Sequence, residues 1–103
     1  MPGRIPPFNL LFERIFLEHY ARLSSAQKRA VDKAVGLLAT NPRHPSLNVH
    51  KAKNVKAKYA GGGSDVFIAY ATRNLRFTFE YGPKAGSIAL RNCGLHDKCE
   101  KKM

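Results

Sequence analysis

The fold is decided by one stretch of sequence, Leu75-Arg76-Phe77-Thr78-Phe79-Glu80-Tyr81. Side chains alternate between the two faces of a strand, so its leucine and aromatic residues share one face and Arg76, Thr78 and Glu80 share the other. Residues 66–70 and 87–93 also read as strands, and the separators 72–74 and 82–86 have the length and the turn residues of hairpin loops. We therefore predict an antiparallel meander.

The residues before position 41 carry a helical period. Two sets of apolar residues predict a first helix over residues 13–23 and a second helix that ends before Asn41-Pro42. The first set is Phe12, Ile15, Phe16, Tyr20 and Leu23, and the second is Ala26, Ala30, Ala34, Leu37 and Leu38. Ser24 followed by Gln27 has the form of a capping box. With residues 8–12 as an edge strand, the predicted fold class is α+β, in the order β-α-α-β-β-β, with a two-helix hairpin packed on a small antiparallel sheet.

Length and charge limit the kinds of protein that the chain can be. Its 103 residues have room for a single domain, which we take to span residues 1–103 with flexible ends at 1–7 and 98–103. The 18 Lys and Arg residues against 7 Asp and Glu residues leave a formal charge of +11. Such an excess destabilises a folded chain by self-repulsion, and a polyanionic partner is the commonest reason for it. Charge alone leaves open a merely soluble basic protein.

Targeting segments and paired cysteines are missing from the sequence. No apolar run reaches the length of a signal peptide or a membrane span, so we expect a cytoplasmic protein that does not bind membranes. Cys93 and Cys99 lack the spacing of a zinc site or a redox motif. We expect Cys93 in the core of a strand and Cys99 as a thiol of the tail, with no disulfide between them in a reducing compartment.

Four short motifs follow one another along the chain. They are Asn41-Pro42-Arg43-His44-Pro45-Ser46-Leu47, Val49-His50-Lys51-Ala52-Lys53, Asn74-Leu75-Arg76-Phe77 and Gly94-Leu95-His96-Asp97. In this order and spacing they resemble the RelE/ParE superfamily of bacterial toxins, over nearly the whole chain. The histidines and lysines are more similar to the RelE and YafQ mRNA interferases than to the gyrase-poisoning ParE branch. The resemblance implies a RelE-like fold of two helices on a twisted antiparallel sheet, cleavage of mRNA on the ribosome with contacts to ribosomal RNA, and neutralisation by a cognate antitoxin.

The residue types can be tested against the chemistry independently. Cleaving RNA without a metal requires a base for the 2′-hydroxyl, cations for the charge on the phosphate, and an acid for the leaving 5′-oxygen. Histidine exchanges protons near neutral pH, and arginine and lysine hold phosphate oxygens. We assign catalysis to His50, Arg76 and His96, and binding of the RNA backbone to Lys51, Lys53, Arg73 and Arg91. The acidic residues are scattered and not clustered as in two-metal nucleases, so we expect no metal and no other cofactor.

Each assignment has an alternative. His50 is either a catalytic base or a solvated loop residue, and His96 either a catalytic acid or a residue that ends the last strand; which histidine is the base stays open. We favour Arg76 over every other site residue. The lysines are expected to bind RNA and not to transfer protons, since nothing in the sequence buries either amine. Asp65 either orients a histidine or merely starts a strand, and His19 and His44 are taken as structural.

One departure from the family pattern leaves the function open. Relatives carry an aromatic residue two positions after the aspartate of the last motif, whereas here Asp97 is followed by Lys98 and Cys99. Stacking on a base would then fall to Tyr59, Tyr70 or Tyr81, which the sequence does not rank. Three functions remain: a ribosome-dependent endoribonuclease, a ParE-like inhibitor that binds DNA gyrase, and a basic RNA- or ribosome-binding module without chemistry.

Overall fold

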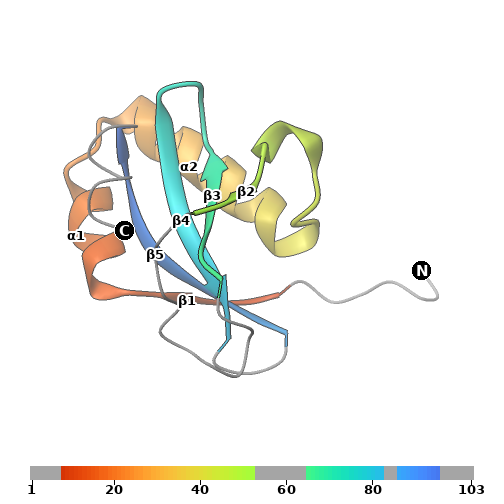
Figure 1. The fold of residues 1–103 in the computed structure, drawn as a ribbon. Coiled ribbons are helices and arrows are strands. Elements are labelled where there is room, and N and C mark those ends of the chain that lie inside the picture. The colour runs from red at the N-terminus through yellow and green to blue at the C-terminus, as the bar shows by residue number, and fades with distance from the viewer. Residues whose placement is uncertain (1–7, 53–64, 83–85, 96–103) are drawn as a thin grey trace.

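Two helices pack against a five-stranded sheet in the computed structural model, which describes residues 8–52, 65–82 and 86–95 (Figure 1). The helices are α1 (Arg14–Ala21) and α2 (Ser25–Thr40), followed by the short 3-10 helix η1 (Pro45–Leu47). The strands are β1 (Asn9–Phe12), β2 (His50–Lys51), β3 (Phe67–Tyr70), β4 (Leu75–Tyr81) and β5 (Ser87–Leu95). The predicted α+β class is confirmed, while the ends predicted to be flexible, 1–7 and 98–103, lie outside the described residues. Within the described part, no helix has the length and apolar character needed to cross a membrane.

The sheet has the strand order β1-β5-β4-β3-β2, and β3, β4 and β5 form the predicted antiparallel meander. The prediction of a wholly antiparallel sheet is wrong at one edge, because β1 runs parallel to β5 with Asn9 opposite Ser87 and Phe12 opposite Leu90. The direction of an edge strand depends on how the rest of the chain returns beside it, and no residue pattern inside β1 records that. β2 forms the other edge. Its length of two residues is too short for a detectable alternation, so the sequence did not predict it.

The helices begin and end where local signals place them. The Gln27 backbone N–H donates to Ser24 Oγ (3.1 Å), and the Ser24 backbone N–H donates to Gln27 Oε1 (2.9 Å), so the predicted capping box is present. The capping box supplies hydrogen-bond acceptors for backbone N–H groups at the start of the helix, which have no acceptor within the helix. α2 ends at Thr40, before Asn41-Pro42 as predicted. Its buried face is rotated from the predicted stripe: the buried residues are Val31, Ala34, Val35, Leu38 and Ala39, whereas Ala26 is exposed.

The core lies between the helices and one face of the sheet. Phe16 of α1, Leu38 of α2, and Phe77 and Phe79 of β4 belong to one cluster of buried residues, each at most 2% exposed. The apolar face predicted for β4 therefore packs against the helices. By alternation along the strand, Arg76 and its neighbours on the same face point to the opposite side of the sheet. That face, opposite the core, carries the polar side chains described below.

A β-bulge in β5 keeps apolar residues of this strand in the core. Thr78 lies opposite Asn92 and the next residue, Phe79, lies opposite Leu90, so Arg91 is the extra residue. Leu90 and Cys93 are three positions apart and would face opposite sides of a regular strand, yet both belong to the core cluster. The inserted residue resets the alternation between them, as a bulge does.

Candidate functional site

The face of the sheet opposite the core brings together His50, Tyr70 and Arg76 from three neighbouring strands. Tyr70 and Arg76 are direct partners across β3 and β4. His50 on β2 lies opposite Ile68, which is two positions before Tyr70 and so shares its face. Phe77, the residue after Arg76, is in the core on the other side. We call His50, Tyr70 and Arg76 the sheet-face cluster.

Tyr70 is the centre of the sheet-face cluster. The Cζ atom of Arg76 lies 3.9 Å from the centroid of the Tyr70 ring, which is a cation–π contact. The His50 ring meets the same tyrosine edge-on, with the centroids 6.0 Å apart and the planes at 74°. One aromatic ring therefore contacts both a titratable imidazole and a permanent cation. The sequence did not rank Tyr70 above the other tyrosines, because its place depends on the pairing of β2, β3 and β4.

Backbone carbonyl groups orient the two polar members of the cluster. Nη2 of Arg76 donates to the carbonyl oxygen of Arg73 at 3.4 Å, and Nδ1 of His50 lies 3.2 Å from the carbonyl oxygen of Asn48. With its proton on Nδ1, His50 donates to that carbonyl and Nε2 is the nitrogen that can accept a proton. His50 is exposed, so a substrate can reach it. Arg73 is exposed in the turn between β3 and β4, beside Arg76.

Lys51 lies on the other face of β2 from His50. Its partner across the strands is Phe67, and its Nζ atom is 3.3 Å from Oδ1 of Asp65. Asp65 thus pairs with a lysine and not with a described histidine. The pair is largely exposed, and such pairs contribute little to stability. Lys53 and His96, the other residues assigned from the sequence, lie outside the described residues.

Arg91, predicted to bind the RNA backbone, forms an ion pair with Glu80. Its Nη1 lies 2.5 Å from Oε1 of Glu80, whose side chain is 0% exposed, while 18% of the Arg91 side chain is exposed. A buried carboxylate requires such a charge partner. The bulge at Arg91 places this side chain next to the strand position of Glu80. Much of its charge is compensated within the protein.

The remaining histidines and the described cysteine have structural contacts. Nδ1 of His19 on α1 lies 2.5 Å from Oδ1 of Asn92, which joins the helix to β5. His44 caps η1, since its Nδ1 accepts from the Ser46 backbone N–H (3.2 Å).

Cys93 is 1% exposed, and burial raises the pKa of its thiol to about 12. The expectation that Cys93 is a core residue is confirmed. Within residues 8–52, 65–82 and 86–95, no three His, Cys, Asp or Glu side chains gather as a metal site would require.

Comparison with known proteins gives a fold and no sequence relative. No family model matches the chain, and no curated protein matches it. Solved structures match over most of its length. The archaeal RelE–RelB complex from Pyrococcus horikoshii OT3 matches with a TM-score of 0.66 and 14% identity, over 86% of this chain and 94% of the other. A YoeB/ParE toxin from Agrobacterium tumefaciens matches with a TM-score of 0.63 and 13% identity, over 85% of this chain and 98% of the other. The E. coli DinJ-YafQ toxin-antitoxin complex matches with a TM-score of 0.60 and 13% identity, over 91% of this chain and 97% of the other.

The chain has a RelE/ParE-like toxin fold. The resemblance seen in the four sequence motifs is thereby confirmed at the level of the fold. In this toxin-like fold the sheet-face cluster and the helix-packed core lie on opposite sides of the sheet.

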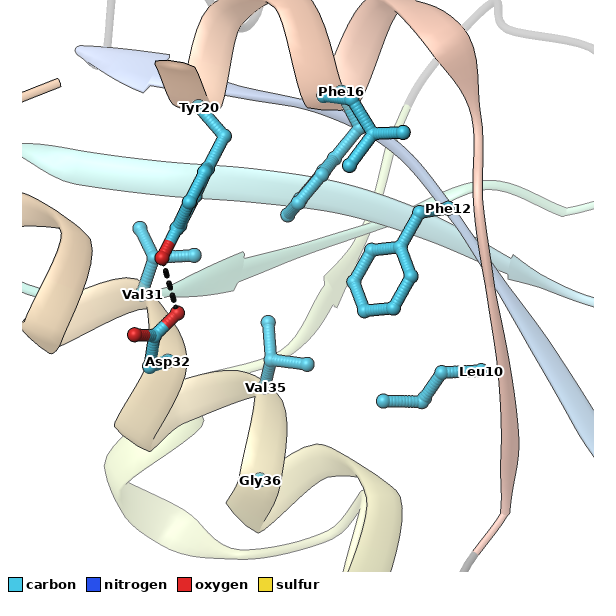
Figure 2. A pocket seen from close by; sticks show the side chains of 9 residues that line it. Leu10, Phe12, Phe16, Tyr20, Val31, Asp32, Val35 and Gly36 are labelled. Atoms are coloured by element: carbon cyan, nitrogen blue, oxygen red, sulfur yellow. Dashed lines mark hydrogen bonds between the residues drawn. The ribbon is translucent and has the colours of Figure 1, made fainter. Parts of the chain in front are cut away.

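The toxin-like fold also has an apolar groove between α1, α2 and β1 (Figure 2). The groove has a volume of about 430 Å³. Figure 2 shows Phe12, Phe16 and Tyr20 facing Val31 and Val35 of α2, with the Tyr20 hydroxyl donating to Oδ1 of Asp32 at 2.7 Å. That hydrogen bond raises the pKa of Tyr20. At the rim, Phe12 is 41% and Leu17 50% exposed, so the groove presents apolar side chains to solvent.

Proposed function

We propose that this protein is the toxin of a type II toxin–antitoxin pair and that it cleaves mRNA on the ribosome. The observation that carries the proposal is the sheet-face cluster, in which one tyrosine ring contacts both His50 and Arg76. The structural neighbours of the chain include RelE, YafQ and YoeB/ParE toxins. The charge of +11 suits a surface of ribosomal RNA.

The proposed reaction is metal-independent attack of the 2′-oxygen on the adjacent phosphorus. The P–O2′ bond forms and the P–O5′ bond breaks, which leaves a 2′,3′-cyclic phosphate and a 5′-hydroxyl. His50 takes the 2′-hydroxyl proton at Nε2, and Arg76 holds the non-bridging oxygens on which charge grows. In this proposal His50 is the base, and His96 gives a proton to the 5′-oxygen as the acid. Base and acid therefore act in opposite protonation states.

The other cations are proposed to hold the RNA backbone around the reacting phosphate. Arg73 is exposed in the turn beside Arg76, which suits a contact to a flanking phosphate. Lys51 is exposed on the edge strand, and Lys53 follows it in the chain. Arg91 shares its charge with Glu80, so we expect its contribution to RNA binding to be smaller.

Expression without an antitoxin tests the proposal directly. Translation and growth should stop, and new mRNA 5′ ends should appear at positions set by the reading frame. The same induction with Arg76→Ala should yield full-length protein and no new ends. The competing function, a gyrase inhibitor, would give double-strand DNA breaks while translation continues, and that outcome would replace the nuclease proposal.

We propose an antitoxin as the protein partner, since the structural neighbours include RelE–RelB and DinJ–YafQ complexes. The basic surface calls for an acidic partner segment, and the apolar groove in Figure 2 accepts the apolar side of an amphipathic one. Leu17→Asp should weaken binding of the cognate antitoxin, measured by calorimetry. Glu18→Ala changes the next residue, which is also exposed, and serves as the control. Equal affinities for both variants would exclude the groove from the interface.

A further inference from the structure

A second pocket lies beside β2 at the sheet edge, on the opposite side of the sheet from the sheet-face cluster. Its volume is about 420 Å³, and its lining includes Arg43, His44, Asn48, Phe67 and Tyr81. Phe67 pairs with Lys51 and not with His50, which puts it on the helix-covered side of the sheet. Nothing in the reaction proposed above uses this pocket.

One wall of the pocket is aromatic and held in place. The rings of Phe67 and Tyr81 meet at 74° with centroids 5.8 Å apart, and Tyr81 also packs against Phe79 at 5.8 Å and Phe8 at 6.0 Å. Neighbours on several sides fix the Tyr81 ring, while part of the residue stays exposed. Burial raises the pKa of Tyr81, with the nearby charge of Arg43 acting in the opposite direction. The phenol is therefore protonated at neutral pH and can donate a hydrogen bond.

The rim of the pocket offers donors and positive charge. Arg43 is exposed, and its charge reaches the Tyr81 hydroxyl. Nδ1 of His44 accepts from the Ser46 backbone, so in the neutral ring the proton is on Nε2, which is then a donor. Among the described residues, those that line the pocket include no acidic side chain. An aromatic wall with a cation at the rim fits a base and its phosphate, because bases stack on aromatic rings and arginine binds phosphate oxygens.

We propose that this pocket binds one nucleotide of a single-stranded RNA, with its base against Phe67 and Tyr81 and its phosphate on Arg43. The inference rests on the proposed function, since the RNA is the proposed substrate, and it adds a subsite outside the reacting phosphate. Asn48 lines the pocket and His50 of the sheet-face cluster is two residues further along. Because β2 is an edge strand, an RNA strand that passes over it contacts both the pocket and the sheet-face cluster.

Fluorine NMR of the full chain tests the proposal. The chain is labelled with 3-fluorotyrosine in an Arg76→Ala background, so that the RNA stays intact, and is titrated with a six-nucleotide single-stranded RNA. Tyr81→Phe assigns the Tyr81 resonance. We expect this resonance to shift on addition of RNA, because a base stacks close to it, whereas the resonance of Tyr20, in the apolar groove, stays in place.

Affinity and its salt dependence give the second measurement. Arg43→Ala should raise the Kd for the same RNA by about tenfold, the loss of one charge-assisted hydrogen bond. It should also reduce the slope of log K against log salt by about 0.7, the value for one phosphate of a single strand. Arg29→Ala removes the same charge from the exposed side of α2 and should leave the slope unchanged.

Equal effects of Arg43→Ala and Arg29→Ala, together with an unmoved Tyr81 resonance, would overturn the proposal. So would a Tyr81 resonance that responds to polyglutamate and not to RNA, which would assign the pocket to an acidic protein. The binding result is independent of cleavage. RNA bound in the pocket by a protein that never cuts mRNA would support the subsite and refute the nuclease.

Discussion

The guanidinium group of Arg76 stacks on the ring of Tyr70 across the β3–β4 pair, with Cζ 3.9 Å from the ring centroid. A long and flexible cation is thereby held in one orientation on the sheet. The same ring contacts His50 at its edge. Tyr70 thus links the proposed base to the proposed electrostatic group, and a change at Tyr70 should affect both.

Tyr70→Ala should lower the single-turnover cleavage rate by about tenfold, because a cation–π contact contributes about 0.5–2 kcal/mol and the guanidinium loses its orientation. Tyr70→Phe keeps the ring and should cleave programmed ribosomes at close to the unmodified rate. Rates of both variants, measured as a function of pH, separate positioning from proton transfer. A phenylalanine variant as slow as the alanine variant would show that the hydroxyl, and not the ring, matters.

Arg76→Ala should reduce the single-turnover rate on the ribosome by about 100- to 1,000-fold, the effect of removing one group that stabilises the transition state. Binding to the ribosome should change much less, because the contact is made fully only in the transition state. Lys51→Ala, which removes an exposed cation from the opposite face of β2, should instead weaken binding and leave the bound rate nearly unchanged. If both variants affect only binding, Arg76 is not part of the reaction.

Glu80→Gln should destabilise the protein by about 3–5 kcal/mol, because it leaves the mostly buried Arg91 guanidinium without its carboxylate. Urea unfolding measures the loss. Glu18→Gln makes the same substitution in the exposed Arg14–Glu18 pair and should change stability by less than about 1 kcal/mol. Similar losses in the two variants would mean that the Glu80–Arg91 pair is as dispensable as a surface pair.

Stability should fall as the pH rises above about 9, in part because of Cys93. Its pKa is raised from 9.0 to about 12 in the folded chain, so between these values the unfolded chain loses the proton and the folded chain keeps it. The stabilisation is therefore complete below pH 9 and is lost above it. The free energy of unfolding is measured with urea at pH 8 and at pH 10. Between these values it should fall by about 1 kcal/mol less for Cys93→Ala than for the unmodified chain. Identical losses would place the Cys93 thiol in contact with water.

Local patterns in the sequence determined most of the secondary structure. The alternation in residues 75–81, the hairpin-length separators and the Ser24–Gln27 capping box predicted β4, its neighbours and the start of α2. Each of these signals depends on residues close together in the sequence, so it can be detected without knowing how distant parts of the chain pack. The order of these elements along the chain predicted the α+β class, and the resemblance of the four motifs to the RelE/ParE superfamily implied the toxin-like fold.

The site depended on contacts between residues distant in the sequence. Tyr70 joins His50 and Arg76 only because β2, β3 and β4 lie side by side, and no feature near position 70 distinguishes it from the other tyrosines. His50 and Lys51 are neighbours in the chain, yet strand geometry sends them to opposite faces of the sheet. The bulge at Arg91 and the parallel direction of β1 likewise arise from strand pairing. Sequence patterns record which face of an element is apolar, whereas register and direction are fixed only when the strands pair and the helices cover one side of the sheet.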